Sequence, residues 1–137
     1  MSDRPALYLD ASAIVKWVVR ESEWRALSTH LRDRPVRVTS RIAFVEVHRA
    51  LARVGGTKSD ERISAVFDRI VMLELDAAVA ATAARLGPLI LRTLDAIHLA
   101  SAMAIGGQLE AIVTYDRRLA DAARTLGIEV ASPGAAI

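Results

Sequence analysis

The stretch ALYLDASAIVKWVV (residues 6–19) joins a short apolar segment to a helical pattern through a single acidic residue. Residues 6–10 predict a short buried strand, and Ser12 is placed to cap a helix that continues through residues 13–19. In open parallel sheets, ligands bind beyond the carboxyl ends of the strands. Asp10 stands at such an end, which makes it the first candidate for a functional side chain.

The same alternation of short apolar segments and helical patterns continues along the chain. Further strands are predicted at residues 36–40, 71–76, 111–116 and 128–133. Helices are predicted at residues 21–34, 41–54, 59–70, 77–86, 94–104 and 117–127, with N-caps at Ser40, Ser59 and Thr93 and a helix end at Gly55–Gly56. Because the strands are apolar throughout, they indicate a mainly parallel sheet covered by helices on both faces. We therefore expect an α/β fold, with residues 1–137 forming a single domain.

The composition is that of a folded protein and is compatible with a reducing compartment. Hydrophobic residues make up 53% of the 137 residues, which argues against disorder. Cysteine is absent, which excludes a disulfide framework and a zinc site built on thiolates. The first residues lack the features of a secretory signal, and no apolar run reaches the roughly 18 residues of a membrane span. We therefore expect a cytoplasmic protein without a membrane partner.

Three further acidic residues fall at comparable places. Asp116 ends the fourth predicted strand, and Asp95 lies in the first turn of the helix predicted at residues 94–104. Glu46 lies about two turns into the helix that follows the second strand, among apolar residues. Because the carboxyl ends of parallel strands share one edge of a sheet, we expect these acids to meet Asp10 there.

Each of these acids also has a local explanation. Asp95 would stabilise the helix dipole, Asp116 has the position of an N-cap, and Glu46 has the position of a solvated helix residue. Four carboxylates at one edge would repel one another unless cations neutralise them, and hard oxygen ligands suit Mg²⁺ or Mn²⁺. The histidines lack the spacing of zinc sites, so His48 and His98 are expected to pack or to support the neighbouring acids.

Four segments of the chain, taken together and in order, carry a family resemblance. They are YLDASAIVKWVVRE (residues 8–21), FVEVHRALAR (44–53), LRTLDAIHLASA (91–102) and IVTYDRRLADAARTLGIEV (112–130). The chain resembles the PIN-domain ribonucleases, and among these the VapC toxins of prokaryotic toxin–antitoxin pairs. The resemblance implies a PIN-like three-layer α/β/α sandwich with a short-stranded, mainly parallel central sheet. It also implies a Mg²⁺- or Mn²⁺-dependent endoribonuclease that hydrolyses RNA phosphodiester bonds, forms a homodimer or a larger toxin–antitoxin assembly, and is inhibited by a cognate VapB-type antitoxin.

The resemblance assigns roles to individual residues. It implies that the metal ligands, which are also the catalytic carboxylates, are Asp10, Glu46, Asp95 and Asp116. Two hydroxyl residues match the family pattern as well, Ser12 beside the first acid and Thr114 two residues before the fourth. These hydroxyls are expected to hydrogen-bond a carboxylate, a metal-bound water or the scissile phosphate, as further members of the catalytic site.

Arginines beside the acids are candidates for binding RNA. The net charge is only +2, but all except two of the 18 basic residues are arginine, whose guanidinium group fits phosphate. Arg92, Arg117 and Arg118 flank the third and fourth acids, and we expect them either to contact RNA phosphates or to lie on a solvated surface. Trp17 and Trp24 are expected in the core, in a groove that receives an antitoxin segment, or partly in both.

Three other classes of protein share parts of this pattern. A haloacid-dehalogenase-like phosphatase needs a second acid two residues after the first, where this chain has Ser12. A response-regulator receiver normally has paired acids near the first strand and a late lysine, whereas lysine occurs here only as Lys16 and Lys58. A non-catalytic PIN-like binding module is the remaining alternative, which the full set of acids disfavours.

Overall fold

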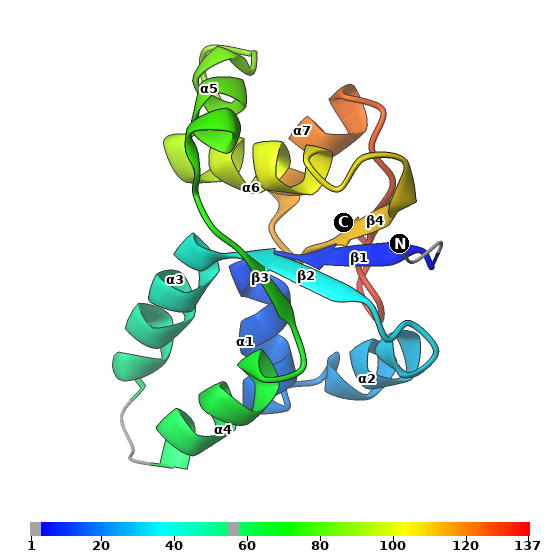
Figure 1. The fold of residues 1–137 in the computed structure, drawn as a ribbon. Helices are drawn as coiled ribbons and strands as arrows, with labels where there is room; N and C mark the ends of the chain where they lie inside the picture. Colours follow the sequence, from blue (N-terminus) through cyan, green and yellow to red (C-terminus); the bar gives the residue numbers. More distant parts are fainter. Residues whose placement is uncertain (1–3, 55–57) are drawn as a thin grey trace.

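A five-stranded sheet forms the middle layer of the computed structural model, which describes residues 4–54 and 58–137 (Figure 1). Its strands are β1 (Ala6–Leu9), β2 (Arg37–Ser40), β3 (Val71–Leu73), β4 (Leu109–Val113) and β5 (Val130–Ala131). The strand order is β3-β2-β1-β4-β5, and every neighbouring pair is parallel. The predicted parallel sheet is therefore confirmed, with β1 in its centre.

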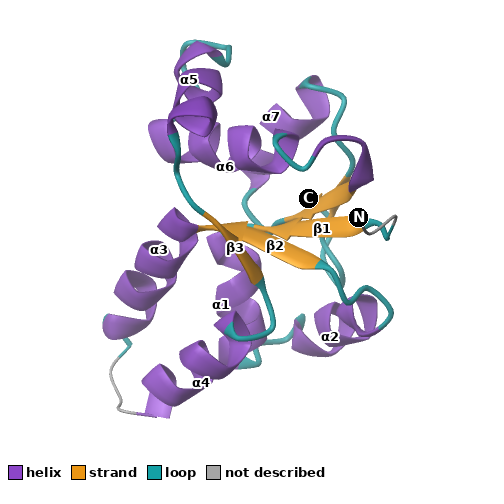
Figure 2. Cartoon of the chain, in the orientation of Figure 1, coloured by secondary structure: helices purple, strands orange, loops and turns teal. Residues whose placement is uncertain are grey.

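Helices cover both faces of this sheet (Figure 2). One face carries α1 (Ala11–Val19), α2 (Trp24–Arg32), α3 (Arg41–Ala52) and α4 (Lys58–Phe67), and the other carries α5 (Ala77–Arg85), α6 (Thr93–Met103) and α7 (Arg117–Thr125). A short 3₁₀ turn, Gly106–Gln108, precedes β4. The expected three-layer α/β/α sandwich is confirmed. Among the described residues, no helix has the length and apolar character needed to cross a membrane.

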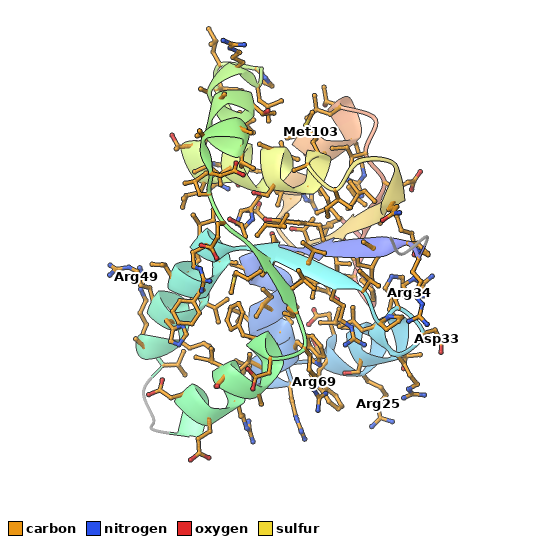
Figure 3. The ribbon with its side chains drawn as sticks, viewed as in Figure 1. Arg25, Asp33, Arg34, Arg49, Arg69 and Met103 are labelled. Carbon is orange, nitrogen blue, oxygen red and sulfur yellow. The ribbon has the colours of Figure 1, made fainter. Side chains whose placement is uncertain are left out.

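The alternation of side chains along β1 builds a core on each face. Leu7 and Leu9 pack in the cluster beneath α1–α4, whereas Tyr8 packs with Leu99 of α6 in the cluster on the other face. All four side chains are fully buried, and full burial of a leucine contributes about 1.5–3 kcal/mol. Figure 3 shows that side chains fill the space between the layers, whereas charged ones such as Arg49 project outward.

The carboxyl ends of β1 and β4 border the crevice of this fold. β1 is followed by α1 on one face, and its neighbour β4 is followed by α7 on the opposite face (Figure 1). A chain that leaves adjacent strands toward opposite faces opens a crevice at the sheet edge, which is where open α/β sheets bind ligands. A backbone hydrogen bond of 3.3 Å from Asp10 N to Val113 O joins the two strand ends.

The predicted caps of α1 and α6 are wrong. Asp10, not Ser12, is the N-cap of α1, because its carboxylate already accepts a hydrogen bond from Ala13 N at 3.0 Å. Thr93 is the first residue inside α6, and Arg92 takes the N-cap position without a side-chain cap bond. The Arg92 side chain instead contacts an acid in the first turn of the same helix.

The predicted N-caps of α3 and α4 and the predicted end of α3 agree with the structure to different extents. Ser40 is confirmed as the N-cap of α3, since its hydroxyl accepts a hydrogen bond from Ile42 N at 3.2 Å. Ser59 is wrong as a cap because α4 begins at Lys58, which places Ser59 inside the helix. The predicted helix end at Gly55–Gly56 lies outside the described residues.

The predicted strands 71–76 and 111–116 each end three residues earlier in the structure. Asp76 and Asp116 leave the sheet and become the N-caps of α5 and α7, where their carboxylates accept hydrogen bonds from backbone N–H groups. Those N–H groups would otherwise have no partner in the first helical turn. The last strand and α2 are likewise shorter than predicted at both ends.

Candidate active site

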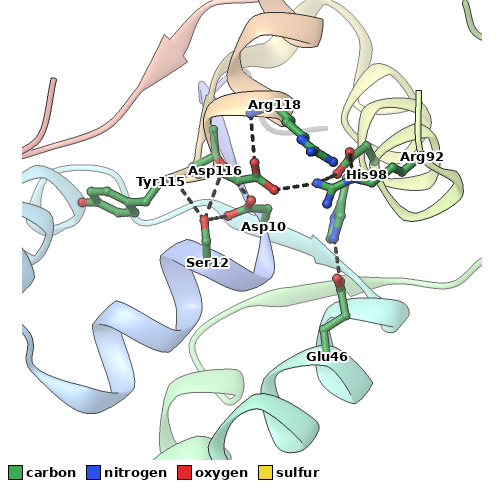
Figure 4. A network of polar contacts seen from close by, with 10 residues as sticks. Asp10, Ser12, Glu46, Arg92, His98, Tyr115, Asp116 and Arg118 are labelled. Atoms are coloured by element: carbon green, nitrogen blue, oxygen red, sulfur yellow. Dashed lines mark hydrogen bonds and ion pairs between the residues drawn. The ribbon is translucent and has the colours of Figure 1, made fainter. Parts of the chain in front are cut away.

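Four acidic side chains that are distant in the sequence surround one pocket of about 470 Å³ at the crevice. Asp10 follows β1, Glu46 lies in α3, Asp95 in the first turn of α6, and Asp116 at the start of α7. Figure 4 shows three of them, Asp10, Glu46 and Asp116, with their polar partners. The structure therefore brings together the four acids that the sequence singled out.

Asp10 is buried and bound by uncharged donors. Its Oδ1 accepts hydrogen bonds from Ser12 Oγ at 2.7 Å and from Ala13 N at 3.0 Å, and its Oδ2 accepts one from Thr114 Oγ1 at 2.6 Å. Burial raises the pKa of Asp10 above its usual value, while His98, when it is protonated, and these hydrogen bonds act in the opposite direction. The carboxylate is thus held in one orientation at an energetic cost.

Ser12 and Thr114 connect the two strand ends as well as holding Asp10. Ser12 Oγ accepts a hydrogen bond from Tyr115 N at 2.8 Å, and Thr114 Oγ1 accepts one from Asp116 N at 3.0 Å. Thr114 is fully buried. Of the roles expected for the two hydroxyls, the structure places both in hydrogen bonds to a site carboxylate.

Arg92 occupies the space between the third and fourth acids. Its Nε donates a hydrogen bond to Asp95 Oδ2 at 2.8 Å, and its Nη2 lies 3.3 Å from Asp95 Oδ1 and 3.0 Å from Asp116 Oδ2. These bonds, first of all those to Asp95, raise the pKa of Arg92. Because 49% of the Arg92 side chain is exposed, this bridge faces solvent and is open to exchange.

Asp95 and Asp116 also have the local roles suggested by their positions. Asp95 is buried in the first turn of α6, where a negative charge is stabilised by the helix dipole. Asp116 Oδ1 accepts a hydrogen bond from Arg118 N at 2.9 Å and thereby caps α7. A local role in the helix and a role at the site are compatible, because the carboxylates of both acids also pair with Arg92 at the pocket.

Glu46 reaches the pocket from the opposite helical layer. Its Oε1 lies 2.7 Å from Nε2 of His98, which projects from α6 (Figure 4). The other ring nitrogen of His98 lies 2.7 Å from the hydroxyl of Tyr8. His98 is therefore a neighbour of the acids, as expected, and both of its nitrogens are engaged.

The other two histidines lie away from the acids. His48 Nδ1 lies 2.8 Å from the carbonyl oxygen of Phe44, and its ring stacks against Phe67. His30 lies in α2, and burial lowers the pKa of its ring. The expected packing role of His48 agrees with these contacts.

A second pocket of about 540 Å³ adjoins the first and shares Asp95 with it. Arg92 and Arg118 line this pocket together with apolar residues and Asp121. Arg117 is exposed in the first turn of α7 and does not line it. Two of the three arginines proposed from the sequence thus border a groove that continues from the acids.

Lys16 and Tyr115 line the acidic pocket but were not predicted as site residues. The Lys16 ammonium pairs with Glu21 and Glu23, both at 3.1 Å, and lies 5.0 Å from the centre of the Tyr115 ring. Burial raises the pKa of Tyr115 to about 12. The spacing of four residues between Ser12 and Lys16 places both on one helix face and is the signal that could have identified Lys16.

Trp17 belongs to the core, where it is 9% exposed. Trp24 is half-buried against the same cluster, donates its Nε1–H to the carbonyl oxygen of Trp17 at 3.1 Å, and packs beneath the guanidinium group of Arg20. Of the two places expected for Trp17, the core and an antitoxin groove, the structure places it in the core. Trp24 retains an accessible side.

The donor set suits a divalent cation, although the protein balances its charges here with its own groups. Carboxylate oxygens are the ligands that Mg²⁺ and Mn²⁺ prefer. In the described residues, no three histidine, aspartate or glutamate side chains are close enough together to hold a metal ion. The Arg92 guanidinium instead brings positive charge between Asp95 and Asp116. A cation bound by these two acids would have to displace this half-exposed arginine.

Comparison with known proteins identifies relatives along almost the whole chain. Residues 7–125 match the PIN domain family. Ribonuclease VapC46 of Mycobacterium tuberculosis is 48% identical over 130 residues, covering 93% of this chain and 98% of that protein. Ribonuclease VapC35 of the same organism is 40% identical over 134 residues, covering 95% and 98%.

Solved structures with low sequence identity share the fold. A toxin–antitoxin complex from Klebsiella pneumoniae matches with a TM-score of 0.72 at 17% identity, covering 93% of this chain and 97% of that chain. The crystal structure of Mycobacterium tuberculosis VapC20, described as a sarcin–ricin loop cleaving toxin, matches with a TM-score of 0.67 at 18% identity, covering 85% and 94%.

Proposed function

The chain belongs to the PIN-domain family and, within it, to the VapC-type ribonuclease toxins, and from this membership we propose that it is a Mg²⁺- or Mn²⁺-dependent endoribonuclease. One observation carries the proposal. Carboxylates from four separate segments surround a single pocket at the crevice of a parallel sheet. Such a concentration of negative charge is costly unless a cation compensates it.

The four acids, Asp10, Glu46, Asp95 and Asp116, are the proposed metal ligands. Hydrolysis of a phosphodiester bond needs an activated water and positive charge beside the phosphate, and one or two divalent cations supply both. Asp10 is already oriented by three hydrogen bonds, so binding requires little rearrangement of it. Asp95 and Asp10 are the proposed central ligands, and Glu46 and Asp116 complete the site directly or through water.

Arg92 and Arg118 are the proposed contacts to RNA phosphates. Both line the groove that adjoins the acids, and the exposed half of Arg92 allows its guanidinium group to turn from the carboxylates to a phosphate. Guanidinium groups bind phosphate oxygens through paired hydrogen bonds. Arg117 lies in the same helical turn as Arg118 and is proposed as a more peripheral contact.

The proposed protein partner is a VapB-type antitoxin, by analogy with the VapC family. Trp24 on α2, which keeps an accessible side, supports a groove for an apolar antitoxin segment near the first helices. A homodimer is also proposed. Leu89 and Ile90, between α5 and α6, are 101% and 90% exposed, which favours burial of this segment against a second copy.

Cleavage of total RNA by the purified chain tests the proposed activity. We expect cleavage with Mg²⁺ or Mn²⁺, none with EDTA, and strongly reduced cleavage by the Asp10→Asn and Asp95→Asn variants. Asp33→Asn, which changes an exposed carboxylate in the turn after α2, is the matched control and should cleave normally. Full activity in Asp10→Asn, or equal activity in EDTA, would contradict the proposal.

A further inference from the structure

Three side chains from three separate elements form a hydrogen-bonded chain that ends at the pocket. Tyr8 comes from the central strand β1, His98 from α6, and Glu46 from α3. The two contacts, Tyr8 OH to His98 Nδ1 and His98 Nε2 to Glu46 Oε1, are both 2.7 Å. The first two residues are buried, and Glu46 alone is partly open to the pocket.

The chemistry of the two end groups favours one direction for the hydrogens in this chain. The Glu46 carboxylate can only accept a hydrogen bond, so His98 Nε2, 2.7 Å away, is the donor to it. In the neutral imidazole, Nδ1 then carries no proton and is an acceptor. Burial raises the pKa of Tyr8, so its hydroxyl keeps its proton and can donate it to His98 Nδ1 at 2.7 Å.

Glu46 needs such a partner more than the other acids do. Asp10 and Asp116 are N-caps fixed by backbone N–H groups, and Asp95 is buried in a helical turn. Glu46 has a longer side chain, is the sixth residue of α3, and has 26% of its side chain exposed. Holding a mobile glutamate in one rotamer costs conformational entropy, which a buried hydrogen bond offsets.

The position of His98 relates Glu46 to the other acids. His98 lies one turn after Asp95 on the same face of α6, and it extends toward α3 on the opposite side of the crevice (Figure 4). The ring is also packed edge-on against Tyr8, with 5.8 Å between ring centres. Because the ring also contacts Tyr8, its Nε2 faces Glu46 from a defined position on α6.

We propose that His98 is a positioning residue, held by Tyr8 through Nδ1, which donates its Nε2–H to Glu46 and fixes this carboxylate at the catalytic pocket. The inference rests on the proposed ribonuclease function for its catalytic consequence. Its structural content, the tautomer of His98, stands independently of that function. Groups that orient the acids of metal sites typically change activity or metal affinity by about 10–100-fold when removed.

The tautomer is measured directly by long-range ¹H–¹⁵N NMR of protein labelled on histidine. We expect the spectrum of the neutral Nε2–H form for His98 in the wild type, and a shift toward a mixture of forms in Tyr8→Phe. Loss of one signal in His98→Gln assigns the His98 signal, and His48→Gln leaves it unchanged, since His48 is bonded to a backbone carbonyl away from the pocket. An Nδ1–H form in the wild type would overturn the inference, whatever the enzyme does with RNA.

A double-mutant cycle tests the catalytic consequence. In RNA cleavage, His98→Leu should lower kcat by about 10–100-fold in the wild-type background and by less than about twofold in a Glu46→Gln background. His98→Gln, which keeps an N–H donor, should recover part of the loss. Equal losses in both backgrounds would overturn the positioning role and indicate a structural one.

The design separates failure of the inference from failure of the proposed function. If the wild type does not cleave RNA, the ribonuclease proposal fails, and the NMR result still decides whether His98 donates to Glu46. If His98→Leu does not fold, Tyr8→Phe replaces it in the double-mutant cycle with Glu46→Gln, because Tyr8→Phe removes only one hydroxyl group. Thermal unfolding of each variant is measured beside the kinetics.

Discussion

The two ends of the acidic pocket satisfy their carboxylates in different ways. Asp10 is buried and receives hydrogen bonds from uncharged groups, including the Ser12 and Thr114 hydroxyls. Asp95 and Asp116 share the charged guanidinium group of Arg92, which is half-exposed. The first arrangement is built into the joined ends of β1 and β4, whereas the second depends on a side chain that can move.

The difference indicates which end of the pocket is preorganised before a metal ion or a phosphate binds. At the Asp10 end, geometry is fixed by the fold, and the cost is a buried charge that lacks a counterion of its own. At the Arg92 end, charge is balanced, and a metal ion or a phosphate must compete with an internal partner. We therefore expect substitutions at the two ends to have opposite effects on metal binding.

The largest expected effect is the loss of catalysis on changing the buried acid. Asp10→Asn should lower the rate of RNA cleavage by about 100–1000-fold, because a metal ligand contributes several kcal/mol to stabilising the transition state. Single-turnover cleavage at saturating Mn²⁺ measures the effect. A loss of less than tenfold would show that the buried end of the pocket is not central to the chemistry.

A second prediction concerns the stability of the Asp10 end. Thr114→Val should lower the free energy of unfolding by about 1–3 kcal/mol, because it removes the donor to Asp10 Oδ2 and the acceptor of Asp116 N in a buried place. Urea denaturation measures it. Thr125→Val, at an exposed position in α7, is the matched control and should change stability by about 0.5 kcal/mol or less.

A third prediction concerns the charged end. Arg92→Gln should tighten Mn²⁺ binding in the absence of RNA by about three- to tenfold, since the cation no longer competes with two ion pairs, each worth up to about 1 kcal/mol. Isothermal titration calorimetry at low ionic strength measures it. Arg124→Gln, which removes an exposed arginine paired with Asp121, serves as the control. Weaker binding in Arg92→Gln would mean that the arginine supports the metal site instead of occupying it.

The smallest expected effect is the pH dependence of stability at the Asp10 end. Because burial raises the folded-state pKa of Asp10, the folded protein takes up this proton before the unfolded chain does. The contribution of Asp10 to stability therefore increases as the pH falls from neutral through its folded pKa toward 3.8, its usual value. In metal-free protein, Asp10→Asn should be more stable than wild type at neutral pH, and the difference should shrink with acidification. A difference that is constant with pH would contradict the assignment.

The fold and the acidic site could be predicted because their signals are local. Asp10, Asp95 and Asp116 stand at a strand end or a helix start, and the rule that parallel strands end at one edge brings these acids together. Glu46 lies farther along α3, the helix that follows the second strand. The placement of Ser12 and Thr93 as caps failed because several residues near a helix start compete for its free N–H groups. Only the geometry decides which of them is used.

The contacts between elements could not be predicted from the sequence. Tyr8 and His98 are separated by 90 residues, and Arg92 and Asp116 by 24. No spacing rule relates such pairs, because they depend on how α6 packs over the sheet. From the sequence, a tyrosine in an apolar strand gives no indication that its hydroxyl forms a hydrogen bond with a distant histidine.

The helix positions of two of the four site acids affect which inactive variant should be chosen for structural or binding work. Asp10 and Asp116 are also the N-caps of α1 and α7. Replacement by alanine would remove a cap worth about 1 kcal/mol together with the charge, so lost activity could reflect a frayed helix. Asparagine caps a helix nearly as well as aspartate. The amide variants are therefore the proper inactive forms, and alanine scanning would overstate the catalytic weight of these two positions relative to Glu46.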